Sequence, residues 1–393
     1  MSAVLGLRGT GQFGTDFRPT NYRELFTLLE PNGAAPLNAL LSMTQSQETD
    51  DPKYNHFRDE LPAQVLRADV GQTSALTTLT FTSTNDINFV VANTVLVNTR
   101  TSEVVRAVAN GVTGSPASVA VVRGQAGSTA AAILTSDVWI IAGFADTEGA
   151  GKPGSVSFDP TTDYNYTQIF KDGVSITGTS AETFLRTGDK ESELVTKALK
   201  LHIGKIERSM FWGRRFEENG SSATPRRYTG GLFNMIPNVT DAASGFATAN
   251  TITENEFDRL LIENVFAWGN KQKIMFAGPR VISNLQKIAK GRWSPTSVDG
   301  AYGVGLTRYS TFAGDLLVYL HPLFRQIPGM DSTAILLDLP FIKYRYMKGR
   351  DTQLKRDVQA NDVDGKEHYY MTECGLELTQ GKPHTVIRNW QAA

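Results

Sequence analysis

One long helical pattern, in a chain otherwise rich in strand patterns, constrains the fold most. Asp189 can cap this helix, and Glu191 and Glu193 suit its positive N-terminal end. At about 189–215 the chain would form roughly 37 Å of helix, about twice the average length, so we expect a rigid strut. The side chains that recur at spacings of three and four are Val195, Leu199, His202, Ile206 and Met210.

The residues before this helix fall into two parts. The first sixty are rich in Gly, Pro, Asn, Thr and charge, with helical patterns only at 22–29 and 37–43. They predict an extended arm that needs a partner surface to become ordered. Residues 63–151 carry few charges and many Thr, Val, Ala and Ser, which predicts a small β-sandwich or barrel. Its expected strands lie at 77–82, 88–96, 103–108, 118–123 and 137–142, and a helical stretch is expected at 128–134.

A mixed α/β segment follows the long helix. Thr253 and Glu256 form a capping-box pattern at the start of a helix that is expected to end near 269–270. A buried strand at 274–277, a helix at 280–290 closed by Gly291, and strands at 316–320 and 334–337 follow. Alternation at 341–347 and 370–378 predicts half-buried strands near the end. The apolar face expected for the capped helix is Phe257, Leu261, Val265 and Trp268.

Composition excludes several classes of protein. The formal net charge is -1 and charged residues make up 20%, whereas a dedicated nucleic-acid binder is usually clearly basic. With 40% hydrophobic residues, the 393-residue chain can bury a large core and is not a disordered protein. A single cysteine cannot form an internal disulfide and fits folding in a reducing cytosol. The sequence shows neither a signal-peptide pattern nor an apolar run long enough for a membrane helix.

The sequence patterns predict no catalytic, cofactor-binding or metal-binding residues. Residues 9–14 match G-x-G-x-x-G, but they lack the strand before and the helix after that a dinucleotide site needs, so a flexible arm is expected. Neither a G-x-S-x-G elbow nor a phosphate-binding P-loop occurs. No two histidines share the spacing of a zinc site, and His202 lies on the apolar stripe of the long helix. The five histidines are His56, His202, His321, His368 and His384.

Three further features have a structural interpretation. Cys374 sits in an alternating run and is expected to be a buried small side chain rather than a nucleophile. Carboxylates are plentiful, so a paired Asp/Glu site stays open, but nothing singles out one pair. Basic clusters at 214–215, 226–227 and 345–356 could contact phosphate, and ion pairing across subunit contacts is the favoured alternative.

The order of segments resembles the Hong Kong 97-like major capsid fold of tailed bacteriophages. Individual phrases are similar to a branch of that family with an elaborated, β-rich extended loop, and together they span most of the chain beyond about residue 62. In the loop region these are ASVAVVR at 117–123, GSTAAAI at 127–133, WIIAG at 139–143 and EG at 148–149. In the remainder they are QIFKDGVSITG at 168–178, RYTGGL at 227–232, WGN at 268–270, and ECGLEL at 373–378 through His384.

The resemblance implies an α+β fold with named parts. These are an N-terminal arm (1–62), an extended loop with a β-rich insertion (63–152), a peripheral domain with the spine helix at about 189–215 (153–232), an axial domain (233–335) and closing strands of the peripheral domain (336–393). It also implies a non-enzymatic subunit without cofactor or metal, made in the host bacterial cytoplasm and located in the virion. Hexamers and pentamers of this chain would enclose double-stranded DNA, which the inner face would contact without sequence specificity.

The implied partners are further copies of the chain, a portal protein, and possible scaffold and decoration proteins, with no membrane. Three alternatives remain at this point. An encapsulin-type nanocompartment shell would share the fold but hold a cargo enzyme. A phage tail or collar protein would account for the β-rich part but not for the long helix. A carbohydrate-active enzyme with an all-β module would need motifs that the sequence lacks.

Overall fold

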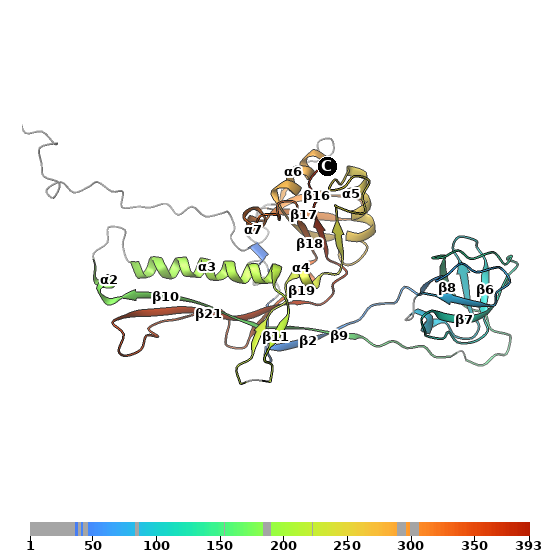
Figure 1. The fold of residues 1–393 in the computed structure, drawn as a ribbon, viewed down its shortest axis with the longest axis horizontal. Helices are drawn as coiled ribbons and strands as arrows, with labels where there is room; N and C mark the ends of the chain where they lie inside the picture. The colour runs from blue at the N-terminus through green and yellow to red at the C-terminus, as the bar shows by residue number, and fades with distance from the viewer. Residues whose placement is uncertain are drawn as a thin grey trace, which may run out of the picture. The chain divides into compact units, whose positions relative to one another are not determined.

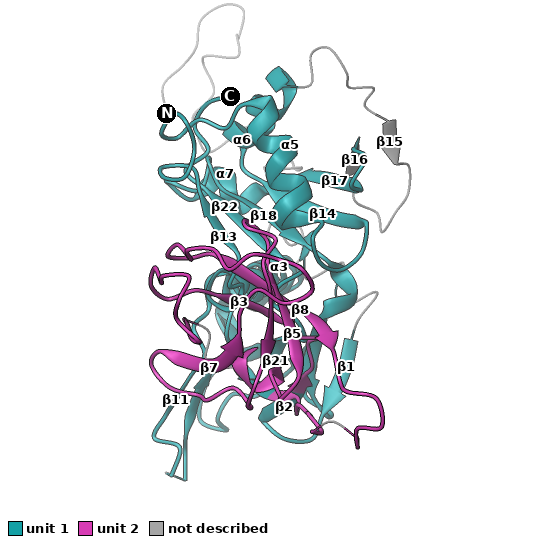
Figure 2. Ribbon diagram, turned by 90° about the vertical axis from the view of Figure 1, so that its right-hand side faces the viewer, with its two compact units in different colours: residues 1–56, 162–393 teal, residues 57–161 magenta. Residues whose placement is uncertain are grey.

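The computed structural model describes residues 36–37, 41, 46–82, 86–152, 154–183, 190–221, 223–288, 296–298 and 306–393. The chain forms two compact units (Figure 1), coloured separately in Figure 2. One is Phe57–Thr161, and the other joins Met1–His56 to Thr162–Ala393. The chain passes between them through β2 (Lys53–Arg58) and β9 (Thr161–Tyr166), which form a two-stranded sheet.

The Phe57–Thr161 unit is a six-stranded antiparallel β structure with its own core. Its strand order is β3-β8-β5-β6-β7-β4. Alternation along the strands is clear in β7, where every second side chain is buried, because one face of each strand points into the core. The core centres on Leu66, Phe81, Leu96 and Trp139. The strands are β3 (Val65–Arg67), β4 (Thr78–Phe81), β5 (Thr94–Asn98), β6 (Val104–Ala107), β7 (Ala117–Val122) and β8 (Val138–Phe144).

Four of the five strands predicted for this unit are confirmed, and two predictions are wrong. The stretch 88–96 is not one strand: it begins in the 3₁₀ helix η3 (Asp86–Phe89), and β5 starts only at Thr94. The expected helix at 128–134 is absent, because side chains satisfy the backbone there. The Glu103 carboxylate accepts the Ala131 N–H, and the Arg123 guanidinium donates to the Ala131 carbonyl.

The long helix predicted at 189–215 is confirmed as α3 (Lys190–Trp212). It packs on β10 (Gln168–Thr177) and β21 (Gly365–Leu378), two long antiparallel strands that run beside it (Figure 1). The same five-stranded sheet has the order β1-β19-β21-β10, with β20 also paired to β21. Its remaining strands are β1 (Ser46–Thr49), β19 (Ile342–Met347) and β20 (Gln353–Lys355). Asp189, the predicted cap, lies outside the described residues, as do residues 9–14 and 22–29.

A seven-stranded mixed sheet forms the other layer of this unit. Its order is β13-β22-β18-β14-β17-β16-β15. The central strands are buried on both faces, as the continuous apolar run at 334–337 requires. Strand β22 joins this sheet although it lies near the end of the chain. The strands are β13 (Val239–Asp241), β14 (Gln272–Ala277), β15 (Thr296–Val298), β16 (Leu306–Ser310), β17 (Asp315–Leu320), β18 (Ala334–Leu337) and β22 (Thr385–Arg388).

Short helices cover the two faces of the seven-stranded sheet. One core contains Phe211 of α3, Phe324 of α7 (Pro322–Gln326) and Phe276 of β14. The other contains Phe257 of α5 (Glu254–Leu260) and Trp390, with α6 (Pro279–Ile288) packed over them. The remaining short elements are α2 (Gly178–Glu182), α4 (Leu232–Met235), the 3₁₀ helix η6 (Leu339–Phe341), and the hairpin strands β11 (Phe216–Glu218) and β12 (Arg226–Tyr228).

The predicted capping box at Thr253 is present, but the helix behind it ends earlier than expected. Helix α5 passes into the π-helix η4 (Leu261–Val265), and Trp268 lies beyond it, half-exposed beside Lys382. The helix at 280–290 is confirmed to Ile288, and Gly291 lies outside the described residues. Strand β21 is continuously buried from Tyr370 onward rather than half-buried, because it lies inside its sheet between β10 on one side and β19 and β20 on the other, and α3 packs on it.

Candidate functional site

Helix α3 is attached to the long strands by a buried polar network rather than by apolar contacts alone. His202 is fully buried, and its Nδ1 lies 2.7 Å from an Asp172 carboxylate oxygen on β10. Its Nε2 lies 2.8 Å from the Thr372 hydroxyl on β21. Burial acts to raise the pKa of Asp172, but hydrogen bonds from Lys205 and His202 outweigh it and hold this pKa below its usual value. One histidine thus links the helix to both strands.

A second network holds the N-terminal end of the same helix. Glu191 accepts a hydrogen bond from Lys366 at 2.9 Å, and its other oxygen lies 2.9 Å from Nε2 of His368. Both partners belong to β21. The hydrogen bond from Lys366, and then that from His368, lower the pKa of the Glu191 carboxyl. Together the two networks attach α3 to the neighbouring strands over about three turns, which holds the helix rigidly in place.

A third buried pair joins α3 to the N-terminal part of the chain. Glu207 and His321 are both fully buried, with Nε2 of His321 3.0 Å from Glu207 Oε1. Nδ1 of His321 accepts from the Leu323 N–H at the start of α7, so Nε2 carries the proton that is donated to Glu207. The same Glu207 oxygen accepts the Leu37 N–H at 2.9 Å. Leu37 and Leu41 are fully buried, so these two residues are part of the core.

The Phe57–Thr161 unit contains two ion pairs that order its loops. Arg123 donates two hydrogen bonds to Glu103, at 2.5 and 2.7 Å, with both side chains nearly fully buried. Arg100 donates two to Asp137, each 2.7 Å long, and also to the Ala132 carbonyl. These bonds fix the 124–134 segment against the ends of β5, β6 and β7. The polar groups thus define loop shape and show no arrangement suited to bond cleavage.

Asp137 gives this unit a pH-dependent contribution to stability. Hydrogen bonds from Arg100 lower its pKa to about 2. Because the pKa is lower in the folded chain, the stabilisation is present above the unfolded pKa of roughly 4 and is lost as the pH falls toward 2. We expect Asp137→Asn to reduce the free energy of unfolding by about 1 to 2 kcal/mol at pH 7 and by progressively less below pH 4. Denaturant unfolding from pH 2 to 7 measures this.

The exposed Asp159→Asn in the same unit is the matched control and should change little at any pH. An Asp137→Asn effect that is equally large at pH 7 and pH 2 would show that its cause is packing rather than the ion pair.

Cys374 is buried, as predicted, on β21. Burial raises the pKa of its thiol to about 12, and its hydrogen bond with Tyr344 only partly offsets this. A thiol with that pKa is almost entirely protonated at neutral pH, so it is not an activated nucleophile.

The histidines lie apart, on β2, on α3, before α7, on β21 and before β22. In the described parts of the chain no group of three or more His, Cys, Asp or Glu side chains is arranged to hold a metal ion. Among the described helices, none combines the length and apolarity that crossing a membrane requires.

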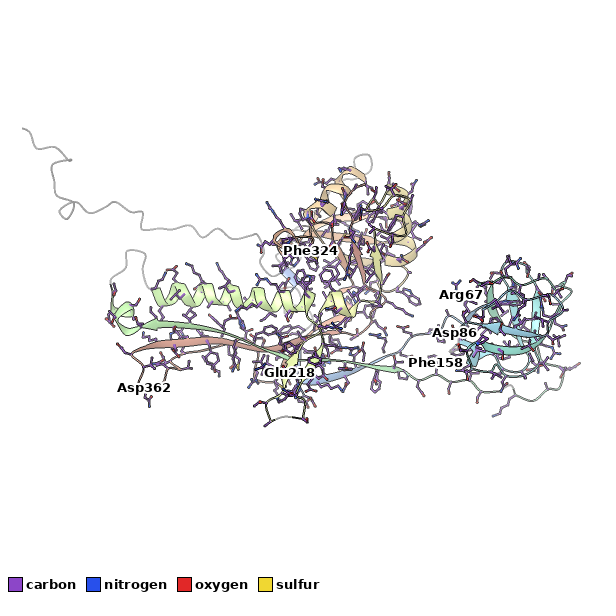
Figure 3. All side chains as sticks on the ribbon, in the orientation of Figure 1. Arg67, Asp86, Phe158, Glu218, Phe324 and Asp362 are labelled. Carbon is purple, nitrogen blue, oxygen red and sulfur yellow. The ribbon has the colours of Figure 1, made fainter. Side chains whose placement is uncertain are left out.

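The basic clusters contribute mainly to ion pairs within the chain. Arg226 and Arg227 pair with Glu218 and Glu217 across the β11–β12 hairpin, where Figure 3 labels Glu218. In the 345–356 cluster, Arg345 pairs with Glu377, and the remaining pairs include Arg350–Glu373 and Lys348–Glu48. Part of their charge is therefore paired within the chain. Ion pairing across subunit contacts stays a prediction.

Sequence reasoning missed the carboxylates of these networks. Asp172, Glu191 and Glu207 look like ordinary surface residues in the sequence, and their partners lie between 30 and 177 residues away. One signal was available. His202 and Glu207 both fall near the apolar stripe of a long helix, where an ionisable side chain must find a partner when it is buried.

Comparison with known proteins agrees with this structural character. The family model of the SU10 major capsid protein matches residues 9–391, nearly the whole chain. A major capsid protein of Pseudomonas phage PaMx41 is 25% identical over 295 residues, which cover 68% of this chain and 70% of that protein.

Among solved structures, the capsid of the native GTA particle covers 99% of this chain and 100% of its own, with 9% identity and a TM-score of 0.48. The structure from Mycobacterium phage Bobi covers 95% of this chain and 96% of its own, with 8% identity and a TM-score of 0.48. The holo-SrpI encapsulin complex of Synechococcus elongatus PCC 7942 covers 98% of this chain and 97% of its own, with 11% identity and a TM-score of 0.46.

The family match confirms the function predicted from the sequence, a phage major capsid protein that self-assembles into the shell of the virion. The α+β class is confirmed by the helices and sheets described above. The chain therefore belongs to the SU10 major capsid protein family.

Proposed function

We propose that this chain forms the hexamers and pentamers of an icosahedral phage head that encloses double-stranded DNA. The observation that carries the proposal is the family match over residues 9–391, which leaves little of the chain for another role. The polar attachment of α3 to β10 and β21 supports it, because a shell subunit must transmit force between neighbours without changing shape.

The predicted parts of the capsid fold become proposals for the structural units. The Phe57–Thr161 unit corresponds to the extended loop and is a few residues longer at each end than the predicted 63–152. Helix α3 and the five-stranded sheet correspond to the peripheral domain, and the seven-stranded sheet to the axial domain. The resemblance assigns β22 to the closing strands of the peripheral domain at 336–393. We propose instead that β22 belongs to the axial domain, because it pairs within the seven-stranded sheet.

We further propose that the role is purely structural, without catalysis or a cofactor. The buried Cys374 and the separated histidines supply no activated nucleophile or metal site among the described residues. The proposed partners are other copies of the chain, a portal protein, scaffold and decoration proteins, and packaged DNA. A near-neutral net charge of -1 suits a shell that encloses DNA without binding it tightly during packaging, since phosphate contacts dominate DNA affinity.

The content of the particles tests this proposal against an encapsulin-type shell. Particles purified from infected or induced bacteria are treated with nuclease, and their contents are then extracted and sized. The proposal predicts double-stranded DNA that was protected from the nuclease. Particles that contain a single cargo enzyme and no protected DNA would contradict it. The control is the same treatment after the particles have been disrupted, which should leave the DNA unprotected.

A further inference from the structure

His368 holds the end of a turn through one specific protonation state. It is almost completely buried on β21, and its Nε2 lies 2.9 Å from Glu191 of α3. Its Nδ1 accepts the backbone N–H of Asp357 at 3.1 Å. An amide N–H can only donate, so Nδ1 has no proton in this arrangement and Nε2 carries one. The ring is therefore neutral in the structure as it stands.

His202 offers a useful contrast on the same helix–sheet layer. Its Nε2 faces the Thr372 hydroxyl, which in turn lies 2.9 Å from the Thr352 hydroxyl. A hydroxyl can reverse its direction, so Thr372 can donate to a neutral ring or accept from a protonated one. A second proton on His202 therefore requires no bond to break. A second proton on His368 would point at the Asp357 N–H and must break that bond.

The turn that His368 holds has, near its start, a residue in the left-handed region. Residues 356–364 connect β20 to β21, and Asp357 has a φ of 52°, the left-handed region that non-glycine residues rarely adopt. The turn is exposed on most of its length, with Asp362 near its tip (Figure 3). Near His368 the backbone is fixed by the Asp357 bond and by the Val358 N–H donating to the Glu367 carbonyl at 2.9 Å. Loss of the first bond removes a restraint on the backbone of Asp357.

We propose that His368 is a pH-sensitive latch, which holds the 356–364 turn when neutral and releases it when protonated while α3 stays attached. On protonation Nε2 keeps its hydrogen bond to Glu191, and that bond then joins two charged groups. The helix therefore remains tied to β21 at acidic pH. Only the Asp357 end of the network opens, so the acidic turn gains freedom without unfolding of the strut.

The charged groups around His368 come from three places. Helix α3 supplies Glu191, which favours the protonated ring. Strand β21 supplies Lys366, which opposes it but is itself bonded to Glu191. The turn supplies Asp357, whose backbone makes the critical bond. Strand β10 places the uncharged Val174 opposite His368. A substitution at Glu191 is therefore expected to shift the pH at which the 356–364 turn is released.

Hydrogen exchange of the full-length subunit at pH 7.5 and pH 5, corrected for intrinsic exchange rates, tests the latch. Protection of amides in the 356–364 turn should fall about three- to tenfold at pH 5, the equivalent of one lost hydrogen bond. Amides of α3 should keep their protection. The Phe57–Thr161 unit contains no histidine, so its amides control for a general effect of acid.

Two variants make the test specific. In His368→Asn, the side-chain oxygen can replace Nδ1 as acceptor and does not titrate, so turn protection should no longer depend on pH. Unchanged protection of the wild-type turn at pH 5, or the same loss in His368→Asn, would overturn the proposal. If that variant does not fold, Glu191→Gln decides: release of the turn should then require a lower pH, and an unshifted midpoint counts against the latch.

Discussion

Replacing Glu207 with alanine should lower the free energy of unfolding by about 3 to 5 kcal/mol. Glu207 Oε1 is the acceptor for two buried donors, the Leu37 N–H and the Nε2–H of His321. Removal of the carboxylate leaves both donors buried without that acceptor and opens a cavity in the core. The rings of Phe211, Phe276 and Phe324 surround His321 at 4.9 to 5.3 Å, so water has little access to replace the lost bonds.

Burial and the nearby charge of Glu207 also raise the pKa of Tyr319.

Denaturant unfolding of the unassembled subunit measures the loss of unfolding free energy in Glu207→Ala, and hydrogen exchange at Leu37 shows whether Leu37 has detached from the core. Arg208→Ala, an exposed substitution one residue further along the helix, is the matched control and should change stability by less than about 0.5 kcal/mol. A loss below about 1 kcal/mol for Glu207→Ala would mean that the pair does not organise this core.

Replacing Arg123 with methionine should destabilise the Phe57–Thr161 unit by about 3 to 5 kcal/mol at neutral pH. The substitution leaves the Glu103 carboxylate buried, with the backbone N–H groups of Ala131 and Gly124 as its donors in the 124–134 segment. Burial tends to raise the pKa of Glu103, and the hydrogen bonds from Arg123 and from the backbone N–H groups of Ala131 and Gly124, together with the charge of Arg123, outweigh this so that the pKa is lowered. Without Arg123 the burial effect dominates, the carboxyl binds a proton more readily, and the loss should be smaller at pH 4 than at pH 7.

Hydrogen exchange of amides in β5 to β8 follows this local loss without requiring the whole chain to unfold at once. Arg67→Met, at an exposed position of the same unit (Figure 3), is the control and should have little effect. The double substitution Arg123→Met with Glu103→Gln should recover part of the stability, because no charge is then left unpaired. Equal losses for the single and the double variants would show that arginine packing, rather than charge pairing, explains the effect.

The spacing of apolar residues and the helix-capping residues allowed most of the regular structure to be predicted from the sequence. The stripe from Val195 to Met210 predicted α3 because a helix of this length shows its apolar face many times over. Thr253 and Glu256 predicted the start of α5, since both partners of a capping box lie within one turn. Cys374 was correctly predicted to be buried, because it alternates with polar neighbours on a strand.

The errors arose where distant residues determine the local structure. The 128–134 segment has helix-forming alanines, yet Arg123 and Glu103 bind its backbone and prevent the helix. Strand β21 is continuously buried in part because β10 and α3, both more than a hundred residues away in the sequence, pack against it, which an alternating pattern cannot reveal. The polar networks of α3 were missed for the same reason, since each pairs residues from separate parts of the chain.

Electron microscopy of particles assembled from this chain, with its scaffold if one is needed, tests the central claim most directly. We expect closed icosahedral shells in which the chain is present as rings of six and of five copies. Each copy should keep α3 bound along β10 and β21, with the Phe57–Thr161 unit in contact with a neighbouring copy. Tubes of a tail, or a chain that stays a monomer of 43.0 kDa under all assembly conditions, would contradict it.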